Sequence, residues 1–136
     1  MIDISSPEIF WLVLTVVLTA LLWIPQILHS ILRAGIKTAL LYPDEAATQY
    51  ADWAVRSKAA HNNAVENLVI FAPLVLLVLL LDIGNELTAL TTLVYFTTRV
   101  FHYVMHVLAI PIMRTIAFLI GFACQLILGI SILGML

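Results

Sequence analysis

The chain has 136 residues, of which 63% are apolar and only 10% are charged, and its net charge is -2 at neutral pH. Four long apolar runs fill most of it, a composition that excludes an ordinary soluble domain. The weak negative charge offers no basic patch for nucleic acid, and a single cysteine, Cys124, excludes an intramolecular disulfide. We therefore expect an all-α integral membrane protein, a four-helix bundle forming one domain over residues 1–136.

The first expected membrane span covers about residues 9–32. Ser6 and Pro7 precede it as a typical helix start, and Pro25 is expected to kink it. The residues before it are acidic rather than basic, so we expect a retained span and not a signal peptide. The connection that follows, 34–55, contains Tyr42-Pro43, which predicts a turn or the start of a short helix.

The segment 56–81 begins as a polar helix and ends as a membrane helix. Only about its last fifteen residues are apolar, whereas a bilayer core of about 30 Å needs about twenty. A span over residues 62–81 therefore draws Asn63, Glu66 and Asn67 into the membrane or its inner edge. An ionisable residue there costs about 2.5–3.5 kcal/mol on insertion scales, so Glu66 indicates a functional or a paired site.

The last two expected spans, 87–108 and 114–136, each carry a patterned face. In the third span, spacings of four, three and four place four polar residues on one side of the helix: Tyr95, Arg99, His102 and His106. In the fourth span, Gly121, Gln125 and Gly129 recur every four residues, which predicts a close helix-packing seam rather than a site.

The orientation follows from the basic residues. Four of them flank the first connection, namely Arg33, Lys37, Arg56 and Lys58, and Arg114 follows the third. The second connection and both ends have none. Because basic residues favour the cytoplasmic side, we expect the first and third connections in the cytoplasm and both termini outside.

In this topology the polar residues of the second and third spans lie in the cytoplasmic half of the membrane. A long arginine side chain can extend along a helix, so Arg99 is expected to meet Glu66. The expected pocket contains Asn63, Glu66, Arg99, His102 and His106, with Arg33, Lys58 and Arg114 at its mouth.

Cations outnumber the single carboxylate of this expected pocket, and buried unpaired cations are unfavourable, so the surplus indicates an anionic ligand. The alternative is a buried Glu66–Arg99 ion pair that only fixes the register of two helices. No third ligand is spaced to join His102 and His106, so no metal site is expected.

The second-span string Asn63-x-x-Glu66-Asn67-Leu68, followed by Phe71-Ala72, resembles a signature of the MAPEG family, the membrane-associated proteins of eicosanoid and glutathione metabolism. The strings Arg99-x-x-His102-x-x-x-His106 and Ile110-Pro111-x-x-Arg114-Thr115 resemble the bacterial branch of that family. The resemblance extends over essentially the whole chain in length, number of spans and loop pattern.

The resemblance implies a homotrimer of four-helix subunits in a bacterial inner membrane. It implies glutathione as a cosubstrate, bound between neighbouring subunits near the cytoplasmic face, with transferase or peroxidase activity toward lipophilic electrophiles that arrive from the bilayer. Asn63 and Glu66 would position glutathione and Arg114 would stabilise its thiolate. Arg33 and Lys58 would hold its carboxylates, and Arg99, His102 and His106 would complete the pocket.

One departure from the family pattern favours a different function. Glutathione-binding members carry an arginine seven residues before the motif glutamate, where this chain has Ala59 beside Lys58. An offset of one residue turns a side chain by about 100°, and lysine lacks the bidentate fork of arginine. The alternatives are a non-catalytic member that binds a lipid or another anion, and proton or ion transport through Glu66 and the histidines.

Overall fold

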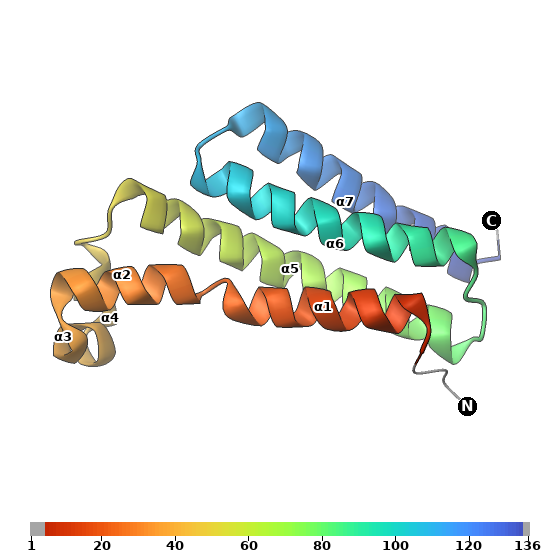
Figure 1. Cartoon of the computed structure of the whole chain (residues 1–136), viewed down its shortest axis with the longest axis horizontal. Coiled ribbons are helices and arrows are strands. Elements are labelled where there is room, and N and C mark those ends of the chain that lie inside the picture. Colours follow the sequence, from red (N-terminus) through yellow and green to blue (C-terminus); the bar gives the residue numbers. More distant parts are fainter. Residues whose placement is uncertain (1–4, 135–136) are drawn as a thin grey trace.

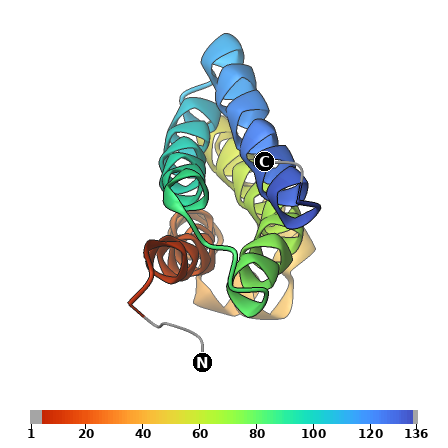
Figure 2. The ribbon, with the colours of Figure 1, turned by 90° about the vertical axis from the view of Figure 1, so that its right-hand side faces the viewer.

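The computed structural model describes residues 5–134 of the chain, almost all of it helical. Helices α1 and α2 follow one another along one side, and α5, α6 and α7 run back and forth beside them (Figure 1). Viewed along the bundle, α1 packs on α5 and α6, and α7 packs on α6 and α5 (Figure 2). The bounds are α1 Pro7–Leu21, α2 Ile24–Ala34, α3 Ile36–Leu41, α4 Pro43–Ala47, α5 Asp52–Leu80, α6 Glu86–Val107 and α7 Pro111–Ile132.

The first expected span divides into two helices. Ser6 caps α1 by accepting a hydrogen bond from the backbone N–H of Ile9 at 3.3 Å. The helix ends at Leu21, and α2 starts at Ile24 with Pro25 in its first turn. Proline has no N–H for the preceding turn and its ring clashes with the carbonyl there, so the expected kink becomes a short break just before it.

Other boundaries also differ from the expected segments. The connection between the first two spans contains α3 and α4, and α4 begins at Pro43 as its sequence suggested. Helix α5 begins at Asp52, so the polar lead-in and the apolar span form one continuous helix of 29 residues. The part of α5 before residue 62 extends the bundle beyond the expected membrane span.

The two turns that join the long helices share one geometry. At the end of α5, Ile83 N donates to Val78 O and Asp82 adopts a left-handed conformation with φ of 54°. At the end of α6, Ile110 N donates to Met105 O and Ala109 has φ of 60°. These bonds satisfy carbonyls at the helix ends and reverse the chain within a few residues. The start of α7 is thereby held against the end of α6.

Three helical segments within residues 5–134 are long and apolar enough to cross a bilayer: Pro7–Ala34, Asp52–Leu80 and Pro111–Ile132. Helix α6 is as long as α7, with 22 residues, but its threonines, Arg99 and its two histidines lower its hydropathy. Thr88, Thr91, Thr92, Arg99 and His102 are buried, whereas large apolar side chains cover the outside of the bundle. A polar interior with an apolar exterior is the pattern of helices that pack in lipid.

The apolar core lies between α1, α5, α6 and α7. Its centre is a stack of Phe71 on Tyr95, with ring centroids 3.6 Å apart and planes 7° from parallel. Stacked aromatic pairs contribute about 0.5–1.5 kcal/mol beyond their buried area, so this contact fixes α5 against α6. The remaining buried members are Leu12, Val75, Val78, Cys124 and Leu128.

The expected packing seam on α7 is present in part. A Cβ atom at Gly121 would overlap Arg99 Nη2, so this glycine allows the guanidinium to lie against the α7 backbone. One turn further, Gln125 Nε2 donates to Asn67 O at 3.1 Å and ties α7 to α5. At Gly129 a Cβ would meet nothing within 4 Å, so this glycine is not needed for close packing.

The two glycines provide a matched test of this seam. Gly121→Ala must displace the Arg99 guanidinium, and overpacking of this kind costs about 1–3 kcal/mol, more than the helix propensity that alanine adds. Gly129→Ala should leave stability unchanged or raise it by up to about 1 kcal/mol. Thermal unfolding of the detergent-solubilised protein measures both. Equal midpoints for the two variants would show that Gly121 does not control the α6–α7 distance.

Candidate ligand-binding site

A small polar cavity lies where the end of α6 meets the start of α7 beside α5. Its volume is about 200 Å³. The turn at Leu108–Ile110 brings the α6 and α7 walls together, and α5 closes the third side. The residues that line it are Asn63, His102, His106, Arg114, Thr115 and Phe118.

Hydrogen bonds hold the start of α5 and the end of α6 together next to this cavity. Arg56 Nε donates to Val107 O at 2.9 Å, and the hydroxyls of Ser57 and Tyr103 are 2.7 Å apart. A further bond runs from Ala51 N to His29 Nε2 at 3.0 Å, which fixes the start of α5 to α2. The walls of the cavity are therefore attached to one another by contacts outside it.

The two histidines form one wall. His102 is buried, and its ring lies 5.5 Å from that of His106 at an interplanar angle of 87°. Phe118 approaches His102 from α7 at 6.5 Å between ring centroids. The Nδ1 atom of His106 is buried and has no hydrogen-bond partner in residues 5–134. This nitrogen is available to a bound molecule.

Asn63 contributes a second unsatisfied atom. Its backbone carbonyl accepts a hydrogen bond from Asn67 Nδ2 at 2.8 Å, which holds the two residues on the same face of α5. Its side-chain Oδ1 is buried without a partner among the described residues. A buried polar atom left unpaired costs about 1–3 kcal/mol, and such atoms in a cavity are expected where a ligand supplies the missing bond.

The charge of the cavity is positive. Arg114 lies half-buried in the first turn of α7, and none of the lining residues is acidic. The N-cap residue of α7, Ile110, provides no side-chain hydrogen bond and Pro111 has no N–H, so the N–H groups of Ile112 and Met113 are left without a side-chain cap. A helix N-terminus and an arginine together favour an anion.

The prediction of an ion pair between Glu66 and Arg99 is wrong for this chain. Asn67 and Phe71 face the core, and Glu66, one residue before Asn67, is turned about 100° away and lies exposed. Arg99 is 3% exposed and donates from Nη2 to Ala117 O at 3.2 Å, and its guanidinium lies 5.3 Å from the Tyr95 ring centroid. Its Nε and Nη1 have no partner within the described part of the chain.

The structure therefore brings together four of the eight residues that the sequence selected: Asn63, His102, His106 and Arg114. Arg33, Lys58 and Glu66 are exposed and outside the cavity, and Arg99 is buried one helical turn from His102 but does not line it. Phe118 was missed, although its place one turn after Arg114 puts both on one face of α7. Thr115 belongs to the string Ile110-Pro111-x-x-Arg114-Thr115, which resembles the family, but it was not expected to line the pocket.

Comparison with known proteins gives one match. A family model described as the MAPEG family matches residues 9–134 of this chain. No curated protein and no solved structure matches it.

The unsatisfied oxygen of Asn63 predicts that this cavity is kept at a cost to stability. Asn63→Leu removes a buried, unpaired polar atom and should raise the free energy of unfolding of the ligand-free protein by about 1 kcal/mol. Asn62→Leu is the control, since Asn62 is exposed on the same helix and should change stability by less than about 0.5 kcal/mol. Thermal unfolding in detergent measures both. A loss of stability in Asn63→Leu would mean that Oδ1 has a structural partner.

Proposed function

The chain belongs to the MAPEG family, and we propose that it binds glutathione and activates the thiol for reaction with lipophilic electrophiles. The observation that carries the proposal is the cavity near the start of α7, which is lined by Arg114 from the first turns of that helix and by Asn63, whose Oδ1 is unpaired. Glutathione offers carboxylates, a thiol, and amide and ammonium N–H groups. The arginine and the helix dipole suit the anionic groups of glutathione, and the unpaired acceptor suits its N–H groups.

In the proposed mechanism Arg114 and the α7 N-terminus stabilise the thiolate. Lowering the pKa of a free thiol from about 8.5 to about 7 requires about 2 kcal/mol, within the range of one hydrogen bond to a charged group. The thiolate attacks an electrophilic carbon, a C–S bond forms, and the leaving group departs with the electron pair. With a hydroperoxide, two glutathione thiols are oxidised to a disulfide while the O–O bond is reduced to an alcohol and water.

The cavity of one chain is too small for the whole of this ligand. Pockets that enclose small molecules measure about 300–1,000 Å³, against about 200 Å³ here. We propose that a homotrimer completes the site and that Arg33, Lys58 and Glu66, exposed in one chain, contact glutathione held between neighbouring subunits. Arg33 and Lys58 would bind its carboxylates and Glu66 its ammonium group.

The remaining selected residues have supporting parts in the proposal. His102 and His106 would hydrogen-bond the ligand, His106 through its free Nδ1. Arg99 would act indirectly, because it holds Ala117 O, three residues beyond Arg114 on α7. It is a positioning residue rather than a ligand contact.

One observation favours the alternative of a non-catalytic member that binds a lipid or another anion. Ala59, at the position where glutathione-binding members carry an arginine, is exposed on α5, and the adjacent Lys58 is exposed as well. The transport hypothesis has no comparable support, since Glu66 is separated from Arg99 and lies outside the cavity that holds the histidines.

Thiolate formation tests the main proposal. Adding glutathione to the purified protein should produce the ultraviolet difference signal of a thiolate, and Arg114→Ala should reduce that signal at least about tenfold, as expected for the loss of about 1.4 kcal/mol or more. Lys37→Ala, which removes one positive charge from α3, is the control and should leave the signal unchanged. Absence of both a thiolate signal and binding heat in the native protein would refute the proposal.

Restoring the family residue separates the proposal from its alternative. If the native chain already binds glutathione through Lys58, Ala59→Arg should tighten binding by less than about tenfold, since it adds at most one exposed charge contact. Isothermal titration with glutathione measures the change. Binding that is undetectable in the native protein and appears only in Ala59→Arg would favour a member that has another ligand.

A further inference from the structure

A second and larger cavity lies at the opposite end of the bundle, among the start of α1, the end of α5 and the start of α6. Its volume is about 400 Å³, twice that of the cavity at the start of α7. Its wall combines polar atoms with apolar side chains, which include Val78, Leu79 and Ala89. It is large enough for a small organic molecule.

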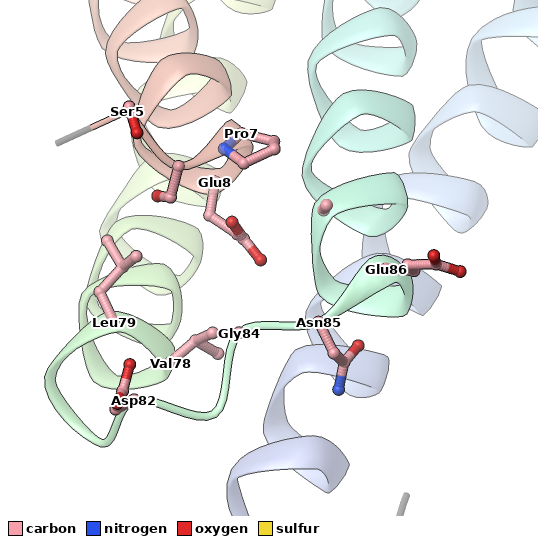
Figure 3. Close-up of a pocket in the computed structure, with 11 residues that line it drawn as sticks. Ser5, Pro7, Glu8, Val78, Leu79, Asp82, Gly84, Asn85 and Glu86 are labelled. Carbon is pink, nitrogen blue, oxygen red and sulfur yellow. The ribbon is translucent and has the colours of Figure 1, made fainter. Parts of the chain in front are cut away.

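Glu8 is the buried charge of this cavity. Its side chain is 4% exposed, and Figure 3 shows it directed into the space between α5 and α6, above the turn at Gly84 and Asn85. Oε1 accepts a hydrogen bond of 2.6 Å from the Thr88 hydroxyl. Gly84 lets Oε1 approach closely, because a Cβ there would lie 3.2 Å from it.

No positive group of the described chain balances this carboxylate. The residues that line the cavity include no lysine, arginine or histidine, and the sequence has no lysine or arginine in residues 1–32 or 59–98. Asp82 adds a second acid at the end of α5, whereas the Glu86 side chain points away in Figure 3. A charged carboxylate with so little contact with water is unfavourable unless a cation or hydrogen-bond donors compensate it, and the Thr88 hydroxyl supplies one such donor.

The cavity suits an organic ammonium ion better than a metal ion as the partner of Glu8. No group of three or more histidine, cysteine or acidic side chains that could hold a metal lies within the described residues. A carboxylate at one side and aliphatic side chains at the other suit an alkylammonium, whose N–H groups donate to oxygen while its carbons pack on Val78, Leu79 and Ala89.

We propose that this cavity binds an organic ammonium group through Glu8. The group is either the headgroup of an aminophospholipid at the membrane surface or a free small amine, and both offer the same chemistry to the carboxylate. The site is separate from the cavity at the start of α7 and does not depend on the function proposed for it.

The experiment has two arms that distinguish these sources. Ethanolamine is titrated calorimetrically into the purified protein, and native mass spectrometry counts the lipids retained from nanodiscs of phosphatidylethanolamine or of phosphatidylglycerol. We expect ethanolamine binding, selective retention of phosphatidylethanolamine, or both. Failure of both arms would overturn the proposal, as would calcium binding without any amine binding.

Two variants and one control assign the binding to this cavity. Glu8→Gln keeps an oxygen acceptor for Thr88 but removes the charge, and should weaken binding or retention about tenfold or more. Ala89→Leu leaves the carboxylate in place and narrows the cavity on the side where the carbons of the amine would pack, and should have a similar effect. Asp44→Asn removes the same charge from α4, at the far end of the molecule, and should change nothing.

Thermal unfolding and size-exclusion profiles identify any variant that fails to fold. If Glu8→Gln does not fold, Ala89→Leu decides the matter alone. Unchanged binding in a folded variant of either kind would contradict the proposed site, because a purely structural role of Glu8 would alter stability without altering amine binding.

Discussion

The Arg99 guanidinium lies against the backbone of α7. This contact is the constraint that sets the geometry of the cavity at the start of α7. A charged side chain at 3% exposure cannot lie between two helices unless one of them leaves room, and Gly121 provides that room. The hydrogen bond to Ala117 O then fixes α7 along its axis relative to α6. Since Arg114 lies one turn before Ala117 and His102 one turn after Arg99, the same contact sets the spacing of the cavity walls.

The two ends of the bundle have opposite electrostatic character. At the start of α7, a cation and a helix N-terminus converge without an acid. At the start of α1, a buried carboxylate lies in a cavity without a cation. Few charges occur between these ends, and in an apolar surrounding a charge is screened weakly by other groups. Each end is therefore expected to select its own class of ligand, an anion at one and a cation at the other.

Local signals in the sequence predicted much of this fold. Ser6 and Pro7 start a helix, Pro25 interrupts one, and the spacing of Arg99 and His102 places both inside, because these features depend on backbone chemistry and helical period alone. The pairing of Glu66 with Arg99 failed for a different reason. Sequence spacing gives the depth of a residue in the membrane, but the rotation of α5 about its axis is set by a tertiary contact, the packing of Phe71 on Tyr95. The cavity around Glu8 depends on two segments far apart in sequence, residues 5–8 and 78–89, and no local pattern indicated it.

The exposed polar residues of α5 bear on the assembly. Glu66 lies on the outer surface of a single chain, in a helix whose neighbouring outward side chains, Val65 and Val69, are apolar and exposed. A glutamate left facing lipid at the depth that the sequence predicts would be unfavourable by about 2.5–3.5 kcal/mol at most, and less near the interface. A neighbouring subunit that covers this face removes the charge from lipid only if it also brings a partner for it. The proposed trimer meets this condition, because it places the ammonium group of a ligand next to Glu66. The outward direction of Glu66, which prevents an ion pair with Arg99, therefore supports a site between subunits.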